Sequence, residues 1–138
     1  MEKGFIKINQ IEGKSPSVEA QLVNNTVWLT KNEIARLFNV FVQTIGNNLR
    51  SIFKNKLLWE EDVTYTNRYM DKKGNERQTI YYNLDALLFV SYRISSLEAR
   101  IFRQWINYSL REHLQKEELK KISQWVWKLQ ADKNYPLS

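Results

Sequence analysis

The first regular pattern of apolar and polar residues along the chain predicts a β-hairpin. Residues 18–22 alternate between apolar and polar side chains, which is the period of a half-buried strand. Asn24-Asn25 follows, and asparagine tolerates the positive φ that a tight hairpin turn requires. Thr26–Leu29 has the composition of a return strand. We therefore expect strands on either side of the asparagine pair, within Val18–Leu29.

Two short amphipathic helices are predicted next. Thr30 and Glu33 have the spacing of a capping box, and the apolar residues that follow fall on one side of a helix that ends near Asn39. Asparagine accepts the left-handed conformation of a helix C-cap. A second helix follows the turn Val40–Val42, with four apolar residues on its inner face: Ile45, Leu49, Ile52 and Phe53.

The second half of the chain predicts another hairpin and two further helices. Asp62–Met70 and Arg77–Asn83 are rich in strand-forming residues, and a polar, glycine-containing segment joins them. Asn83 can cap a short apolar helix, and Ser95 or Ser96 can cap a long one from Leu97 toward Leu129. The elements together predict an α+β fold.

The composition limits the chemistry that the chain can perform. The 138 residues contain no cysteine and one histidine, His113, and the formal net charge is +6. The cysteine count excludes disulfides and cysteine nucleophiles. Glu60-Glu61-Asp62 is a run of carboxylates without a second cluster to face it, and we expect neither cofactor nor metal. We therefore expect a protein that is not an enzyme, and a nuclease is the enzymatic alternative.

The segment from Ile34 to Trp59 combines helix-turn-helix spacing with an absence of acidic residues. Ala35 supplies the small residue where two such helices cross, and Asn39 stands at the turn, where glycine is more usual. The segment holds four cations and no Asp or Glu. Short amides and cations on one helix face are typical of a helix that enters the major groove of DNA.

The outer face of the second helix therefore supplies the candidate DNA contacts. Early positions of a recognition helix usually touch base edges. We assign the base-facing role to four residues: Gln43, Thr44, Asn47 and Asn48. Contact with the DNA backbone falls to three later ones: Arg50, Ser51 and Lys54. The simpler alternative is the ordinary polar outer face of an amphipathic helix.

A hairpin directly after a recognition helix is the wing of a winged helix. Its tip and flanks hold four cations that we expect to contact the DNA backbone: Arg68, Lys72, Lys73 and Arg77. Asp71 and Glu76 offset part of this charge, and the alternative is a solvated turn. We therefore expect a winged helix-turn-helix with an N-terminal β-hairpin and a long C-terminal helix, whose partner is double-stranded DNA.

The long C-terminal helix offers a different function. Its apolar stripe is wide enough for one side to pack on the domain and the other on a second copy, and the candidate homodimer residues are Trp105, Trp125 and Trp127. The alternative to DNA binding is therefore a protein-interaction module that binds no nucleic acid. We divide the chain into an N-terminal arm (residues 1–17), a DNA-binding domain (18–115) and a helical extension (116–138).

The chain also resembles a known family over residues 18–115. The resemblance rests on a set of short motifs in a fixed order: Trp28-Leu29-Thr30, Ile34–Phe38, Thr44-Ile45, Ile52-Phe53, Tyr81–Ala86, Tyr92–Ser96, Phe102–Trp105 and Leu110–Leu114. These motifs are similar to the start of the RhuM-type virulence protein family. The helix with Phe102-Arg103-Gln104-Trp105 is also similar, more weakly, to the end of BRO-N-type phage domains.

The resemblance implies a bacterial protein of mobile elements and pathogenicity islands with a winged-helix-like N-terminal module. It favours a role in transcription or in the control of mobile elements. Typical members are longer, so the chain is either a short member or an excerpt. Residues 1–7 lack the apolar core of a signal peptide, and no apolar run approaches the length of a membrane span. We therefore expect a cytoplasmic protein with no membrane partner.

Overall fold

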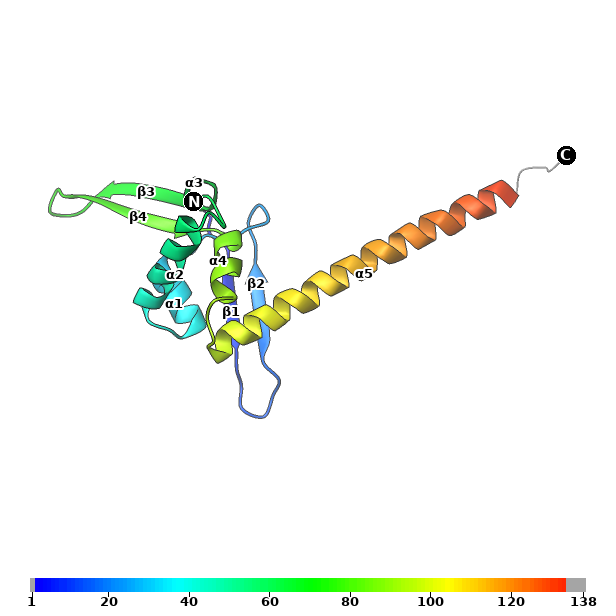
Figure 1. Ribbon diagram of the computed structural model, residues 1–138, viewed down its shortest axis with the longest axis horizontal. Helices are drawn as coiled ribbons and strands as arrows, with labels where there is room; N and C mark the ends of the chain where they lie inside the picture. The colour runs from blue at the N-terminus through cyan, green and yellow to red at the C-terminus, as the bar shows by residue number, and fades with distance from the viewer. Residues whose placement is uncertain (1, 134–138) are drawn as a thin grey trace. The chain divides into compact units, whose positions relative to one another are not determined.

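The computed structural model describes the backbone of residues 2–133 and the side chains of residues 2–128. The chain forms a mixed α+β structure with two small antiparallel sheets and a long C-terminal helix (Figure 1). The elements in chain order are β1 (Phe5–Asn9), β2 (Ser17–Gln21), α1 (Lys31–Phe38), α2 (Val42–Lys54), α3 (Glu60–Val63), β3 (Thr64–Met70), β4 (Glu76–Tyr82), α4 (Leu84–Ser91) and α5 (Leu97–Lys133). The predicted α+β class is confirmed.

The chain divides into two compact units, Met1–Gln104 and Trp105–Ser138, and the boundary falls within α5. The first unit holds both sheets, α1 to α4 and the first turns of α5. The second unit consists of the rest of α5, and residues 134–138 of the predicted helical extension lie outside the described residues.

The N-terminal hairpin differs from the prediction in its choice of strands. The strand predicted at residues 18–22 is present as β2, but it pairs with β1, from Phe5↔Gln21 to Asn9↔Ser17. The predicted return strand Thr26–Leu29 was wrong, and part of the predicted N-terminal arm supplies the partner strand instead. An alternating pattern identifies a strand but not its neighbour, which is why the sequence misled here.

The asparagine turn is present, although it closes only one bridge. Asn24 and Asn25 have φ values of 52° and 65°, and Val23 and Thr26 pair across them. Beyond this bridge the chain does not pair with β2. The backbone of Leu29 instead exchanges hydrogen bonds of 2.9 and 2.7 Å with the backbone of Tyr82. Leu29 thus pairs with the last residue of β4, far along the chain, rather than with β2.

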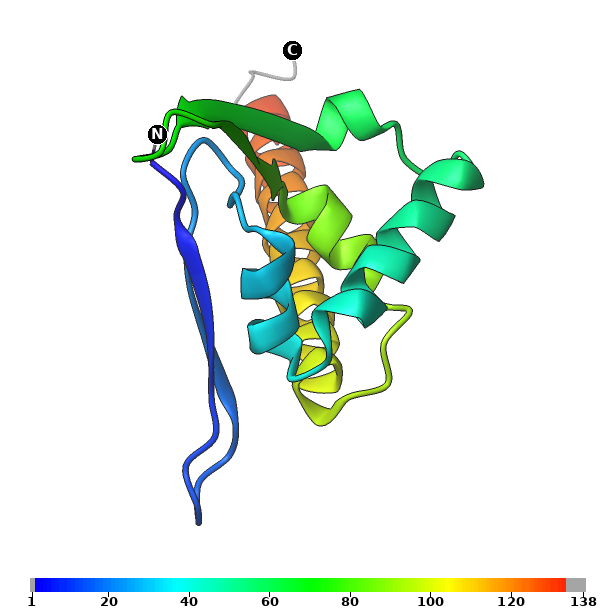
Figure 2. The same ribbon diagram turned by 90° about the vertical axis from the view of Figure 1, so that its left-hand side faces the viewer.

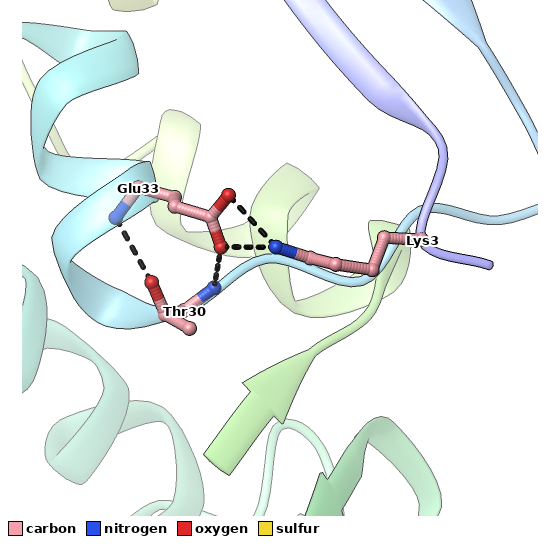
Figure 3. A network of polar contacts seen from close by, with 3 residues as sticks. All are labelled: Lys3, Thr30 and Glu33. Carbon is pink, nitrogen blue, oxygen red and sulfur yellow. Dashed lines mark hydrogen bonds and ion pairs between the residues drawn. The ribbon is translucent and has the colours of Figure 1, made fainter. Parts of the chain in front are cut away.

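The start of α1 is fixed by the predicted capping box (Figure 3). The Glu33 N–H donates to Thr30 Oγ1 at 3.2 Å, and the Thr30 N–H donates to Glu33 Oε1 at 3.0 Å. Lys3, which precedes β1, adds a salt bridge to the same carboxylate at 2.7 Å. The helix ends as predicted, with Asn39 in the left-handed conformation at φ 54°. The two ends of α1 are therefore determined by local chemistry.

We expect Glu33→Gln to lower the free energy of unfolding by about 1 kcal/mol at neutral pH and to change it little in acid. Burial alone would raise the pKa of Glu33, but the hydrogen bonds from Lys3 and from the Thr30 backbone outweigh it and leave the pKa below its ordinary value. A lowered pKa gives stability that is present above the unfolded-state value and is lost as the pH falls through the folded-state value. Urea unfolding of both proteins across that acidic range measures the difference. A gap that stays constant through the titration would contradict this account.

The core of the first unit forms where α1, α2, α4 and the start of α5 meet (Figure 2). Ile45, Leu49 and Ile52 are buried as predicted, whereas Phe53 is only half-buried and stacks on Tyr82 at 6.5 Å. Phe38 of α1 is fully buried and meets the ring of Phe102 edge to face, with centroids 5.5 Å apart. These contacts hold α2 against the unit by one face and leave the opposite face exposed.

The second predicted hairpin is confirmed as β3 and β4, which extend as a two-stranded arm from the first unit (Figure 1). Their register runs from Thr64↔Tyr82 to Met70↔Glu76. The helices that follow begin as predicted. Asn83 Oδ1 accepts the Ala86 N–H at 3.2 Å, and Ser96 Oγ accepts the Ala99 N–H at 3.1 Å. The pairing of Leu29 with Tyr82 ties this hairpin to the strand-like segment before α1.

Candidate nucleic-acid interface

The exposed face of α2 carries a row of four polar side chains that we call the outer stripe: Gln43, Asn47, Arg50 and Lys54. Their spacing of three and four residues places them one above another on a helix. The stripe is opposite the buried Ile45, Leu49 and Ile52. Arg50 Nη1 donates to Asn47 Oδ1 at 3.1 Å, which joins an amide to a cation on this face. The stripe combines hydrogen-bonding amides with positive charge and contains no carboxylate.

The other three predicted contact residues of α2 lie on a flank of the helix and are half-buried: Thr44, Asn48 and Ser51. Asn48 Nδ2 donates to the Thr44 carbonyl at 2.9 Å. Arg93, in the connection after α4, donates from Nε to Asn48 Oδ1 at 3.1 Å and from Nη2 to Ser51 Oγ at 2.8 Å. These three residues are therefore not part of the outer stripe. Two of them, Asn48 and Ser51, bind Arg93 and so connect α2 to the segment after α4.

Arg93 is a residue whose role the sequence did not reveal. It lies 45 positions from Asn48, so no local spacing connects the two. Its side chain holds the flank of α2 from outside the helix pair. The helix that carries the outer stripe is therefore held by a contact that only the tertiary structure reveals.

The β3–β4 register separates the four predicted cations of the hairpin into different settings. Arg68 is paired with Gln78 and shares a sheet face with Tyr82, whose ring stacks on Phe53 of α2. Arg77 lies on the opposite face and forms a salt bridge with Asp71 at 3.0 Å. Arg68 is thus on the α2 side of the hairpin, while Arg77 is paired with an acid.

Asp71 organises the tip of this hairpin. Its carboxylate accepts the backbone N–H groups of Asn75 and Lys73, each at 2.9 Å, and the Arg77 guanidinium. The Asn75 N–H contributes most and Arg77 next to holding the pKa of Asp71 below its ordinary value. The ammonium groups of Lys72 and Lys73 remain exposed at the tip. The tip is thus a closed turn that presents two lysines.

Two open hollows share a further cation, Lys31, and one of them borders the outer stripe. One, of about 550 Å³, is lined by Lys31, Arg50, Lys54, Glu60 and neighbouring apolar residues. The other, of about 440 Å³, lies between the starts of α1 and α2 and the strand β4, and Lys31 lines it too. Lys31 therefore stands between α2 and the hairpin. Its positive charge matches the charge of the cations in the outer stripe, but one lysine at a helix start gives no distinctive sequence signal.

Phe41 is a third residue, after Arg93 and Lys31, that the sequence interpretation missed. It is the N-cap of α2, makes no side-chain cap hydrogen bond and is 84% exposed. The signal was present in the sequence, because an aromatic residue stood where a polar N-cap is expected.

The tryptophans predicted for a dimer interface do not form one patch. Trp105 is half-buried, whereas Trp125 is 63% and Trp127 is 70% exposed. Residues two apart on an α-helix point about 200° apart, so Trp125 and Trp127 lie on different sides of α5. The second unit also exposes an apolar row at helical spacing: Leu119, Ile122 and Val126.

The candidates for acid–base chemistry do not form a cluster within the described part of the chain. Glu60, Glu61 and Asp62 form the exposed single turn α3, and His113 is exposed on α5. Among the described residues, no group of three or more His, Asp or Glu side chains could hold a metal ion. None of the helices in the described part is long and apolar enough to cross a membrane.

Comparison with known proteins supports a resemblance over one segment of the chain. No curated protein and no solved structure matches the chain. A family model does match, over residues 61–123, which extend from α3 through the β3–β4 hairpin and α4 into α5. The resemblance predicted from the sequence motifs is therefore confirmed over this segment, which matches the model of the Virulence protein RhuM family.

Proposed function

We propose that this protein binds double-stranded DNA as a winged helix and acts in the cytoplasm in transcription or mobile-element control. The family description links the chain to virulence. In the proposed arrangement, α1 and α2 are the helix-turn-helix, α2 is the recognition helix and the β3–β4 hairpin is the wing. The Leu29–Tyr82 bridge ties the proposed wing to the segment that precedes α1.

The observation that carries this proposal is the outer stripe of α2. Two amides and two cations occupy the exposed face of a helix that three buried residues hold in place. Gln43 and Asn47 have the chemistry to pair with adenine, and Arg50 and Lys54 the chemistry to bind phosphate or guanine. Lys31, Arg68, Lys72 and Lys73 extend the positive charge toward the wing. Among the described residues, Glu60 contributes the one carboxylate that lines either of the two hollows.

The burial of Thr44, Asn48 and Ser51 narrows the proposed set of contacts. Asn48 and Ser51 bind Arg93, so we propose that they position the recognition helix and do not read bases. Arg77 is engaged by Asp71, and Arg68, Lys72 and Lys73 are left as the proposed wing contacts. No catalytic step is part of this proposal.

The test is duplex binding by the whole chain at several salt concentrations. Neutralisation of phosphates releases counterions, so the logarithm of the binding constant should fall linearly with the logarithm of salt concentration. Selection from a pool of duplexes with a randomised segment, repeated at two salt concentrations, would give the preferred sequence. A chain that binds no duplex at low salt would overturn the proposal.

A second candidate function is self-association through the second unit. Leu119, Ile122 and Val126 are 58%, 50% and 43% exposed and follow the three- and four-residue spacing of a helix–helix seam. We expect light scattering to give the mass of two chains, and Leu119→Ala/Ile122→Ala to restore the mass of one. Leu110→Ala/Leu114→Ala is the matched control, since these two exposed leucines lie on another side of α5. A mass of one chain for the unaltered protein would contradict this function.

A further inference from the structure

The residue type and the exposure of Phe41 have no explanation within the fold. The preferred N-cap residues are Ser, Thr, Asp and Asn, because their side chains accept a backbone N–H of the first turn. Thr30 and Asn83 do this for α1 and α4, but Phe41 makes no such bond for α2. Its side chain is also 84% exposed, so it gains little from burial. Neither capping nor core packing accounts for a phenyl ring at this position.

Phe41 stands at the end of α2 where the outer stripe begins. Its carbonyl accepts the N–H groups of Thr44 and Ile45, at 3.0 and 3.4 Å, which anchors its backbone to the first turn. Val42, the next residue, is 44% exposed, and Gln43 follows on the stripe. Along α2 the exposed chemistry therefore changes from apolar at the N-terminal end, through amides, to cations at the C-terminal end.

This order matches what an A·T pair presents in the major groove. Thymine differs there from the other bases by its C5-methyl group, which makes apolar contacts with side chains such as Phe. Adenine, its partner, offers a donor and an acceptor that Asn and Gln bind bidentately. An apolar group at Phe41 and an amide two residues on, at Gln43, stand at the same end of α2 and could contact both halves of one pair or of two adjacent pairs.

We infer that Phe41 is a specificity-determining residue whose ring contacts a thymine C5-methyl group in the major groove. The inference rests on the proposed DNA-binding function and deepens it, because it names a base and a side chain. The absence of acidic residues from Ile34 to Trp59 favours a polyanion over a protein as the occupant of this surface. Phosphates farther along the groove would meet Arg50 and Lys54, which lie toward the other end of α2.

The test replaces thymine by uracil, which lacks only the C5-methyl group. The probe is a duplex selected by the protein from a randomised pool, with each thymine exchanged in turn for deoxyuridine. We expect at least one exchange to weaken binding about fourfold, the value of one methyl group removed from water. The Phe41→Ala protein should bind the thymine duplex more weakly and should not respond to that exchange.

Two further variants separate the contact from folding and from general hydrophobicity. Phe41→Ser installs a preferred N-cap, so it should unfold at an equal or higher denaturant concentration and still lose the thymine–uracil difference. Phe5→Ala is the matched control, because Phe5 is a 44% exposed phenylalanine on β1, and it should keep that difference.

Each remaining outcome overturns a separate statement. If the duplex binds and no uracil exchange matters, or if Phe41→Ala keeps the thymine–uracil difference, DNA binding stands and the assignment of Phe41 fails. If no duplex binds at low salt, the proposed function itself fails and takes the assignment with it. If Phe41→Ala binds every duplex like the unaltered protein but loses self-association in light scattering, Phe41 serves a protein contact and not a base.

Discussion

Replacement of Phe38 by alanine is expected to lower the free energy of unfolding by about 3–5 kcal/mol. Phe38 is fully buried at the end of α1, and its ring packs edge to face against Phe102 of α5. The substitution removes both the burial and the aromatic contact and leaves a cavity that the close-packed neighbours fill only in part. It would also detach α1 from the first turns of α5. Urea unfolding followed by tryptophan fluorescence gives the difference.

Phe41→Ala is the matched control for this experiment. It removes the same atoms three residues along the chain from a side chain that is 84% exposed, and we expect a change within about 0.5 kcal/mol. Equal losses for the two variants would show that exposure does not distinguish them and would contradict the described core.

The double variant Arg50→Ala/Lys54→Ala is expected to lose most of the affinity for duplex DNA at low salt. If each cation neutralises one phosphate, the slope of log binding constant against log salt should become less steep by about 2. The loss should be similar for all sequences, because phosphate contacts carry no base information. Neither side chain is buried, so folding should be unaffected. Fluorescence anisotropy with a labelled duplex, at four or more salt concentrations, gives the slope.

Lys7→Ala/Lys14→Ala is the charge-matched control. These two lysines are exposed on β1 and in the loop after it, away from α2, and their removal changes the net charge by the same amount. We expect the slope of this control to stay close to that of the unaltered protein. An equal flattening in both double variants would mean that binding follows total charge, and the interface on α2 would then be refuted.

The contrast between α1 and the N-terminal hairpin shows what kind of information the sequence contains. Both ends of α1 were predicted correctly, the start from Thr30 and Glu33 and the end from Asn39. Each cap involves groups within four residues of one another, so the local sequence contains the signal. The alternation at residues 18–22 correctly indicated a strand. The alternation could not show whether the partner strand lies before or after these residues in the sequence. Both β1 and Thr26–Leu29 are short segments that contain apolar residues.

The candidate interface divides in the same way. Helical periodicity predicted that Gln43, Asn47, Arg50 and Lys54 face outward, and they do. The same periodicity grouped Asn48 and Ser51 with them, because residues on the flank of a helix are polar whether they meet solvent or another polar group. The hydrogen bonds from Arg93 show that Asn48 and Ser51 meet a polar group. Because Arg93 lies 45 residues from Asn48, the local sequence pattern contains no signal of this contact.

By itself, the sequence determined the caps, the polar face of α2, the strand composition of the hairpins and a resemblance to the Virulence protein RhuM family that a family model confirms over residues 61–123. These features arise from neighbouring side chains or from recognisable motifs. Only the tertiary structure decided that β1 is the partner of β2, that Leu29 pairs with Tyr82 and that Arg93 holds the flank of α2. Such pairings depend on which distant segments the collapse of the core brings together, and hydrophobic periodicity sets the face of an element without choosing its neighbour.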